Sequence, residues 1–92
     1  MKSAHVVIEG VVQGVNYRAW TQRAAAELEL TGWVRNRLDG TVEALFCGET
    51  ELVDRMVARC WEGPAPARVT NVRLLPFSGE APPPPFEVLP TV

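Results

Sequence analysis

The sequence of 92 residues is poor in the side chains that build several common kinds of site. It contains two cysteines and one histidine. Cys47 and Cys60 lie on different expected elements, without the close spacing of a disulfide scaffold or a zinc site. Because a free cysteine behaves as a small apolar side chain, we expect both thiols to be reduced and buried. With one histidine and few clustered carboxylates, we expect neither a metal site nor a cofactor.

Long apolar runs and a strong charge of either sign are also missing. No stretch of about 18 apolar residues is present, and Met1 to His5 leads directly into an alternating pattern instead of the apolar centre of a signal peptide. The formal net charge is −2 and the pI is about 5.3, so no overall field attracts a polyanion. We expect a cytoplasmic monomer without membrane or nucleic-acid partners.

Motifs of several phosphate-transferring enzymes are absent as well. No arginine follows a cysteine at a spacing of six residues, since Val53 and Pro66 occupy these positions after Cys47 and Cys60. There is no Asp-x-Asp pair for an aspartyl-phosphate enzyme and no Gly-x-x-x-x-Gly-Lys nucleotide loop. A histidine mechanism needs a pair of histidines, so we expect His5 to be structural.

The residues that are present fit one small globular domain. Apolar residues make up 47% of the chain and charged residues 22%. A chain of this length buries about 60–65% of its unfolded surface on folding, which is enough for one core. Because we find no internal repeat and no dividing linker, we expect residues 1–92 to form a single domain.

Hydrophobic periodicity predicts the order strand, helix, strand, strand, helix, strand. Asp39-Gly40 between two extended segments is a strong hairpin signal, and we expect Thr31-Gly32 to end the first helix. This order is typical of the α+β class and of the ferredoxin-like split βαβ sandwich, βαββαβ, an antiparallel sheet with both helices on one face. We expect strands over residues 4–12, 33–38, 41–47 and 68–76, helices over 17–30 and 50–62, and a short edge strand over 86–89 after the proline run 82–85.

The segment from Gly10 to Arg18 has the features of an anion-binding loop. It turns through Gly14 into a helix, whose N-terminus carries unpaired N–H groups and the positive end of the dipole. An arginine in the first turn opposes that dipole by up to about 1 kcal/mol, so the placement of Arg18 is easier to explain if an anion binds beside it. On this segment alone, a surface arginine after a tight turn is the more common arrangement.

Taken together with a second motif at residues 32–48, this loop resembles the acylphosphatase family. The resemblance covers nearly the whole chain. Family members usually have phenylalanine or methionine where this chain has Tyr17, and we expect the added hydroxyl either to change loop packing or to add a hydrogen bond near the anion, without abolishing activity. The matching residues are Gly10, Val12, Gln13, Gly14, Val15 and Arg18 in the first signature, Gly32, Trp33, Val34, Asn36, Gly40, Val42 and Gly48 in the second, and Gly63-Pro64, Ala67-Arg68-Val69 and Phe86-Glu87-Val88 beyond them.

The resemblance implies hydrolysis of acyl phosphates, which are carboxyl–phosphate mixed anhydrides, to carboxylate and inorganic phosphate. It implies that Arg18 binds the phosphoryl group of this small-molecule substrate and that Asn36 orients the attacking water. Guanidinium groups form paired, charge-assisted hydrogen bonds with phosphoryl oxygens. The carboxylate leaving group has a low pKa and needs no general acid. The backbone N–H groups implied to complete the site are those of Gln13, Gly14, Val15, Asn16, Tyr17 and Arg18.

Two other functions fit the same fold. An RNA-binding sheet uses aromatic residues in a basic strand motif, whereas the first strand here offers His5, Val7 and Glu9. A non-catalytic module that binds an anion or regulates a partner is the main alternative. The presence of both Arg18 and Asn36 favours the enzyme.

Other conspicuous side chains have simpler explanations. Trp20 and Trp61 lie on apolar helix stripes, and we expect both in the core. Trp33 is expected to pack on a strand. Arg35 and Arg37 alternate with Asn36, so we expect them on the opposite, solvated face of the sheet.

Overall fold

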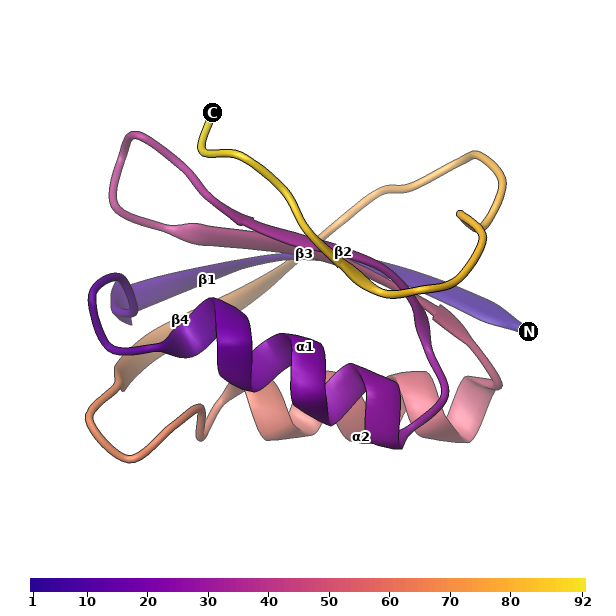
Figure 1. Ribbon diagram of the computed structural model, residues 1–92, viewed down its shortest axis with the longest axis horizontal. Coiled ribbons are helices and arrows are strands. Elements are labelled where there is room, and N and C mark those ends of the chain that lie inside the picture. The colour runs from indigo at the N-terminus through magenta and orange to yellow at the C-terminus, as the bar shows by residue number, and fades with distance from the viewer.

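Two helices cover one face of a five-stranded sheet in the computed structural model of the protein, which describes residues 1–92 (Figure 1). The predicted order of elements and the ferredoxin-like arrangement are confirmed. The elements are β1 (Lys2–Val11), α1 (Tyr17–Glu27), β2 (Thr31–Asn36), β3 (Val42–Gly48), α2 (Thr50–Cys60), β4 (Arg68–Leu75) and β5 (Glu87–Val88).

The strands are arranged in the order β4-β1-β3-β2-β5. The first four pair antiparallel, and every residue of the central strand β3 is buried. The prediction of an entirely antiparallel sheet is wrong at one edge, because β5 pairs parallel with β2 through Trp33 opposite Glu87 and Val34 opposite Val88. The chain leaves β4 at one edge and crosses to the other before β5 begins, and this path sets the direction of the last strand (Figure 1).

The hydrophobic core lies between the helices and the sheet. Alternate residues of β1 and β2 point into it, together with the apolar stripe of α2, as the periodicities predict. Its fully buried members include Val6, Ile8, Ala25, Val34, Phe46, Val53, Met56 and Cys60.

The helix α1 ends earlier than predicted, and Gly32 does not end it. Glu29 adopts the left-handed conformation with a φ of 56°, and Leu30 N–H then bonds back to the carbonyl of Ala25 at 2.9 Å. Gly32 instead lies in β2, where a Cβ atom would stand 1.8 Å from the carbonyl oxygen of Leu45. Glycine is needed at position 32 for close packing of two strands, not for a helix terminus.

The pairing of β1 with β4 is irregular close to the point where the chain leaves the sheet toward α1. The register with β4 shifts between Glu9 and Gly10, so that Glu9 opposes Asn71 and Gly10 opposes Val69. Gly10 has a φ of 125°, and a Cβ atom there would lie 2.0 Å from the carbonyl oxygen of Arg68. The extra residue is Thr70 of β4, and the irregularity lies beside the end of β1, after which the loop at residues 12–16 begins.

The cysteines and tryptophans give one confirmation and one correction. Cys47 and Cys60 are free and buried, as predicted, and burial raises the pKa of the Cys60 thiol to about 12. Trp20 packs against the edge of the core. The prediction for Trp61 is wrong, because 49% of it is exposed. It follows the last residue of α2 and points about 100° away from the buried Cys60.

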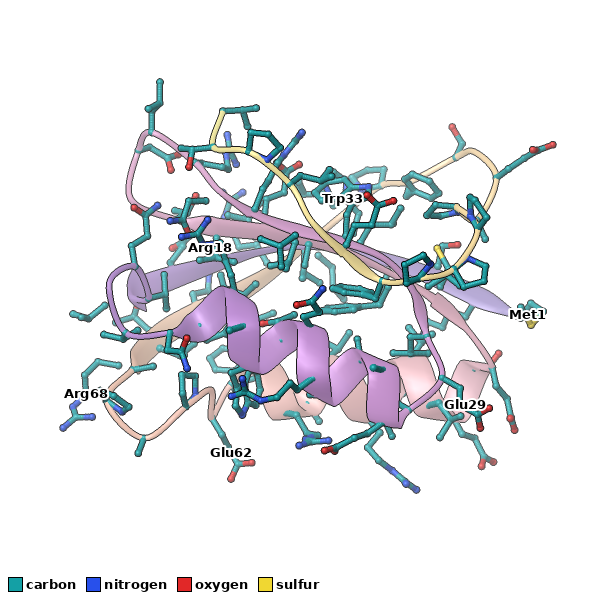
Figure 2. All side chains as sticks on the ribbon, in the orientation of Figure 1. Met1, Arg18, Glu29, Trp33, Glu62 and Arg68 are labelled. Atoms are coloured by element: carbon teal, nitrogen blue, oxygen red, sulfur yellow. The ribbon has the colours of Figure 1, made fainter.

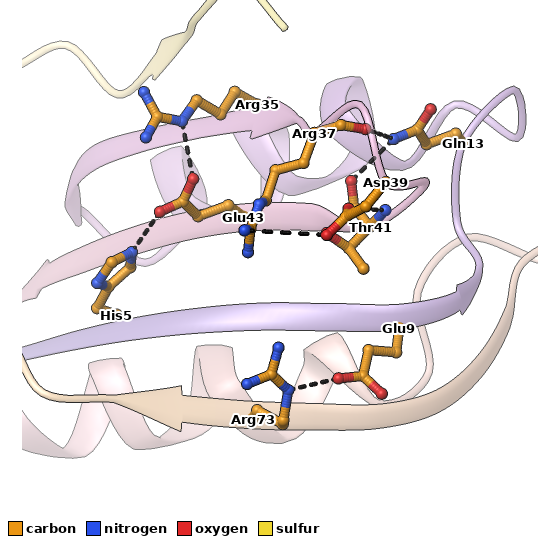
Figure 3. A network of polar contacts seen from close by, with 9 residues as sticks. All are labelled: His5, Glu9, Gln13, Arg35, Arg37, Asp39, Thr41, Glu43 and Arg73. Carbon is orange, nitrogen blue, oxygen red and sulfur yellow. Dashed lines mark hydrogen bonds and ion pairs between the residues drawn. The ribbon is translucent and has the colours of Figure 1, made fainter. Parts of the chain in front are cut away.

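The sheet face away from the helices carries a polar network centred on Glu43 (Figure 3). His5 Nε2 donates to one carboxylate oxygen at 2.6 Å, and Arg35 Nε donates to the other at 2.9 Å. Burial alone would raise the pKa of Glu43, but hydrogen bonds from Arg35 and His5 outweigh it and hold the pKa below its usual value. His5 is thus held as a structural histidine, and Arg35 lies on the face opposite Asn36.

Trp33 packs on this same face. The Arg35 guanidinium lies 4.5 Å above its ring centre, and the His5 ring contacts it edge-on at 5.8 Å. Phe77, which lies in the segment between β4 and β5, packs edge-on against His5, with 6.3 Å between the ring centres. The packing role predicted for Trp33 is confirmed.

Candidate active site

A cavity of about 440 Å³ opens between the loop before α1 and the end of β2. Its lining includes Asn36 and all of the predicted loop residues except Val15, whose side chain packs against the core. Ala19 and Gln22 of α1 and Val88 of β5 also line it. The fold therefore brings the two sequence motifs to one cavity, although they lie on different elements.

The loop that lines this cavity has unpaired backbone donors. Gly14 and Asn16 have left-handed φ angles of 74° and 69°, and the first helical hydrogen bond runs from Trp20 N–H to Asn16 O at 3.1 Å. The N–H groups of residues 13–16 donate no hydrogen bond within the chain, and those of residues 17–19 precede the first helical bond. The start of α1 has neither a side-chain cap nor an acidic residue. Such a helix N-terminus attracts an anion.

Arg18 adds a positive charge at this position. It lies in the first turn of α1, on the side of the helix that faces the sheet, and is half-buried (Figure 2). Its guanidinium takes part in none of the ion pairs of the molecule. An arginine that lines a cavity with no acidic partner is free to bind an anionic ligand.

Asn36 is the last residue of β2 and pairs with Val42 of β3. It shares a strand face with the buried Val34, so its side chain points to the helix side of the sheet. Its carbonyl oxygen Oδ1 is buried and has no hydrogen-bond partner, and the residue lines the cavity. The backbone of Asn36 is held by Val92 N–H, which donates to its carbonyl at 3.1 Å.

The side chain of Gln13 makes a contact that the sequence does not indicate. Its Nε2 donates to the carbonyl oxygens of Arg37 and Thr41, each at 2.8 Å (Figure 3). From the sequence we expected only the backbone of Gln13 to act. These partners lie 24 and 28 residues away, and no local pattern links residues at such a separation.

The hydroxyl of Tyr17 is directed into the protein, toward the end of α2. It donates to the carbonyl of Cys60 at 2.6 Å, and burial raises the pKa of Tyr17, so the hydroxyl stays protonated. The ring also packs against Gly63, where a Cβ atom would lie 2.6 Å from it. The expected hydrogen bond near the anion is wrong, because the hydroxyl bonds to the carbonyl of Cys60, whereas the expected change in loop packing stays a prediction.

The structure has no cluster of three or more His, Cys, Asp or Glu side chains suited to a metal. Neither helix is long and apolar enough to cross a membrane.

Comparison with known proteins identifies the family. A family model described as acylphosphatase matches residues 4–87. The chain belongs to the acylphosphatase family. It is 51% identical over 92 residues to an acylphosphatase of Nitrobacter hamburgensis. This match covers 95% of this chain and 93% of the relative. It is 52% identical over 71 residues to an acylphosphatase of Pelotomaculum thermopropionicum, covering 77% of each.

Solved acylphosphatase structures share the fold. The acylphosphatase of Coxiella burnetii superposes with a TM-score of 0.88 at 39% identity, covering 95% of this chain and 90% of that one. The acylphosphatase of Bacillus subtilis gives 0.86 at 29% identity, covering 97% and 99%. Family and fold together make this chain a hydrolase that acts on small-molecule acyl phosphates.

Proposed function

We propose that this acylphosphatase binds the phosphoryl group with Arg18 and the N–H groups of residues 13–18, and that Asn36 orients the attacking water. The observation that carries the proposal is that Asn36, whose Oδ1 is buried and unpartnered, lines the same cavity as Arg18. A buried acceptor without a donor costs about 1–3 kcal/mol. A water that donates to this oxygen satisfies it and becomes fixed beside the anion site.

The chemistry follows from these positions. Arg18 and the loop N–H groups stabilise the charge on the three non-bridging phosphoryl oxygens as the transition state forms. The water, held by Asn36, attacks phosphorus in line with the bond to the carboxyl oxygen. That bond breaks, the carboxylate leaves with the electron pair, and the attacking water releases a proton to the surrounding solvent as phosphate forms. Positioning and charge stabilisation are most of what a protein supplies to such a reaction.

We propose that this reaction needs no metal ion or other cofactor. Arg18 and the backbone donors supply the positive charge that a metal supplies in many phosphoryl-transfer enzymes. All of the proposed site residues come from one chain, which supports a monomeric enzyme with residues 1–92 as its single domain.

Hydrolysis of benzoyl phosphate tests the proposal. We expect the wild type to turn over with excess chelator present, and kcat/KM to fall about 100-fold or more in both Arg18→Ala and Asn36→Ala. Arg23→Ala is the matched control, because Arg23 lies on the exposed side of the same helix, and we expect it to retain wild-type activity. Circular dichroism checks that each variant is folded.

Inhibition by inorganic phosphate separates the two roles. A lost charge-assisted bond weakens binding, so we expect Arg18→Ala to raise the Ki for phosphate about tenfold or more. Asn36→Ala removes a contact to water and should leave that Ki within about twofold. Full activity in Asn36→Ala would exclude its proposed role. A wild type that binds phosphate without turnover would favour the non-catalytic module.

A further inference from the structure

The side chain of Gln13 joins the two halves of the proposed site. Its single amide nitrogen uses both hydrogens on the hairpin between β2 and β3, on the carbonyls of Arg37 and Thr41 (Figure 3). These two residues form the neck of the hairpin, because Arg37 N–H donates to Thr41 O at 2.9 Å and Gly40 N–H to Arg37 O at 3.1 Å. Gln13 therefore binds the neck on both of its sides, next to the end of β2 and the start of β3. We call this pair of bonds the Gln13 clamp.

The clamp spans a part of the molecule where the sheet no longer connects the two halves. Direct pairing between β1 and β3 ends at Ile8 and Val42, before the loop begins. The start of α1 is anchored elsewhere, since Tyr17 bonds to Cys60 at the end of α2. No other side-chain hydrogen bond links the loop at residues 12–16 to the hairpin. The clamp thus sets the separation between the loop donors and the end of β2.

We propose that Gln13 is a positioning residue for hydrolysis, which acts through Asn36. This inference rests on the proposed function of Arg18 and Asn36. Arg37, one of the two clamped residues, directly follows Asn36 in the chain. Attack in line requires the water oxygen about 3–3.5 Å from phosphorus, and a displacement of about 1 Å costs about 100-fold in rate. The clamp holds the Asn36 side chain where the water that it orients stands at this distance from phosphorus.

The proposal predicts a selective loss of kcat. Gln13→Met keeps a side chain of similar length and removes both donors, and Gln13→Ala removes the same bonds with a smaller side chain. Steady-state hydrolysis of benzoyl phosphate should show kcat lowered about 10- to 100-fold in both variants. The Ki for inorganic phosphate should stay within about threefold, because Arg18 and the loop N–H groups remain. Lys2→Met is the control, since it breaks the Lys2–Asp54 ion pair at the surface, and it should retain wild-type kcat.

A double-mutant cycle distinguishes positioning from a general structural effect. In an Asn36→Ala background there is no oriented water to displace, so Gln13→Met should lower kcat further by less than about twofold. A purely structural role would multiply the two losses and would also raise the Ki for phosphate. Unfolding in urea, measured for each variant, separates lost stability from lost rate.

The outcomes separate the clamp from the function on which it rests. An active wild type with unchanged kcat in both Gln13 variants, or with multiplicative losses in the cycle, would overturn the clamp alone. A wild type without any turnover would overturn the proposed function, and the catalytic role of the clamp with it.

Discussion

At the scale of single residues, we propose that one side chain of this site binds the phosphoryl group and another positions the attacking water. Arg18 carries charge and has no acidic partner, whereas Asn36 is neutral and offers one buried oxygen. Tyr17 directly precedes Arg18 in the chain, but its hydroxyl points into the protein and bonds to the carbonyl of Cys60. Neighbours along the chain can therefore serve function and folding separately, because adjacent side chains at a helix start point about 100° apart.

Tyr17→Phe tests this division. Loss of the hydrogen bond to the Cys60 carbonyl should lower the free energy of unfolding by about 1 kcal/mol. The turnover of benzoyl phosphate should not change, because the hydroxyl does not face the cavity. Urea unfolding and steady-state kinetics on the same preparation measure both. A changed kcat at unchanged stability would contradict the division of roles.

At the scale of elements, two glycines with positive φ angles show what strand packing requires. Gly32 in β2 has a φ of 133° and leaves no room for a Cβ atom, which would lie 1.8 Å from Leu45 O. Gly40, in the hairpin turn, has a φ of 93° and open space around it. Both positions strain an L-residue, but only Gly32 adds a steric clash with a neighbouring strand.

Alanine substitutions at positions 32 and 40 should separate the energetic cost of a strained backbone from the cost of a steric clash. We expect Gly32→Ala to destabilise the fold by about 3 kcal/mol or more, because β2 has to move away from β3. Gly40→Ala should lower the free energy of unfolding by about 1 kcal/mol, because only the backbone conformation is unfavourable there. Thermal or urea unfolding gives both values. Equal losses would show that contact with Leu45 does not decide the preference for glycine.

At the scale of the whole molecule, the candidate site forms where distant segments meet at one end of the sheet. The loop before α1, the hairpin after β2 and the C-terminal segment lie together at this end (Figure 1). That last segment runs along β2, with Leu89 N–H donating to Val34 O at 2.9 Å and Val92 N–H to Asn36 O at 3.1 Å. The opposite face of the sheet is held by the network around Glu43, which joins the three strands β1, β2 and β3.

This network predicts how the stability of the whole fold depends on pH. Glu43 has a lowered pKa in the folded state, so its contribution is complete above its ordinary value of 4.5. The contribution is lost as pH falls through the lower folded value, because the protonated carboxyl loses its charged hydrogen bonds with Arg35 and His5. We expect Glu43→Gln to be less stable than the wild type at neutral pH.

Urea unfolding between about pH 6 and about pH 3 provides the measurement. The difference between wild type and Glu43→Gln should shrink toward the acid end, since both then carry a neutral side chain at this position. A difference that stays constant over this range would mean that the charge of Glu43 contributes nothing to stability.

The sequence by itself determined the elements, the family and two of the side chains proposed to act, because these depend on local patterns. Alternation, helical periodicity, Asp39-Gly40 and the motifs around Arg18 and Asn36 are all contained in short stretches. Only the tertiary structure decided that both side chains line one cavity, that Gln13 binds the hairpin neck and that Tyr17 turns inward. It also decided the parallel pairing of β5 and the exposure of Trp61. These features arise from packing between segments far apart in the chain, and local periodicity carries no information about which distant surfaces meet.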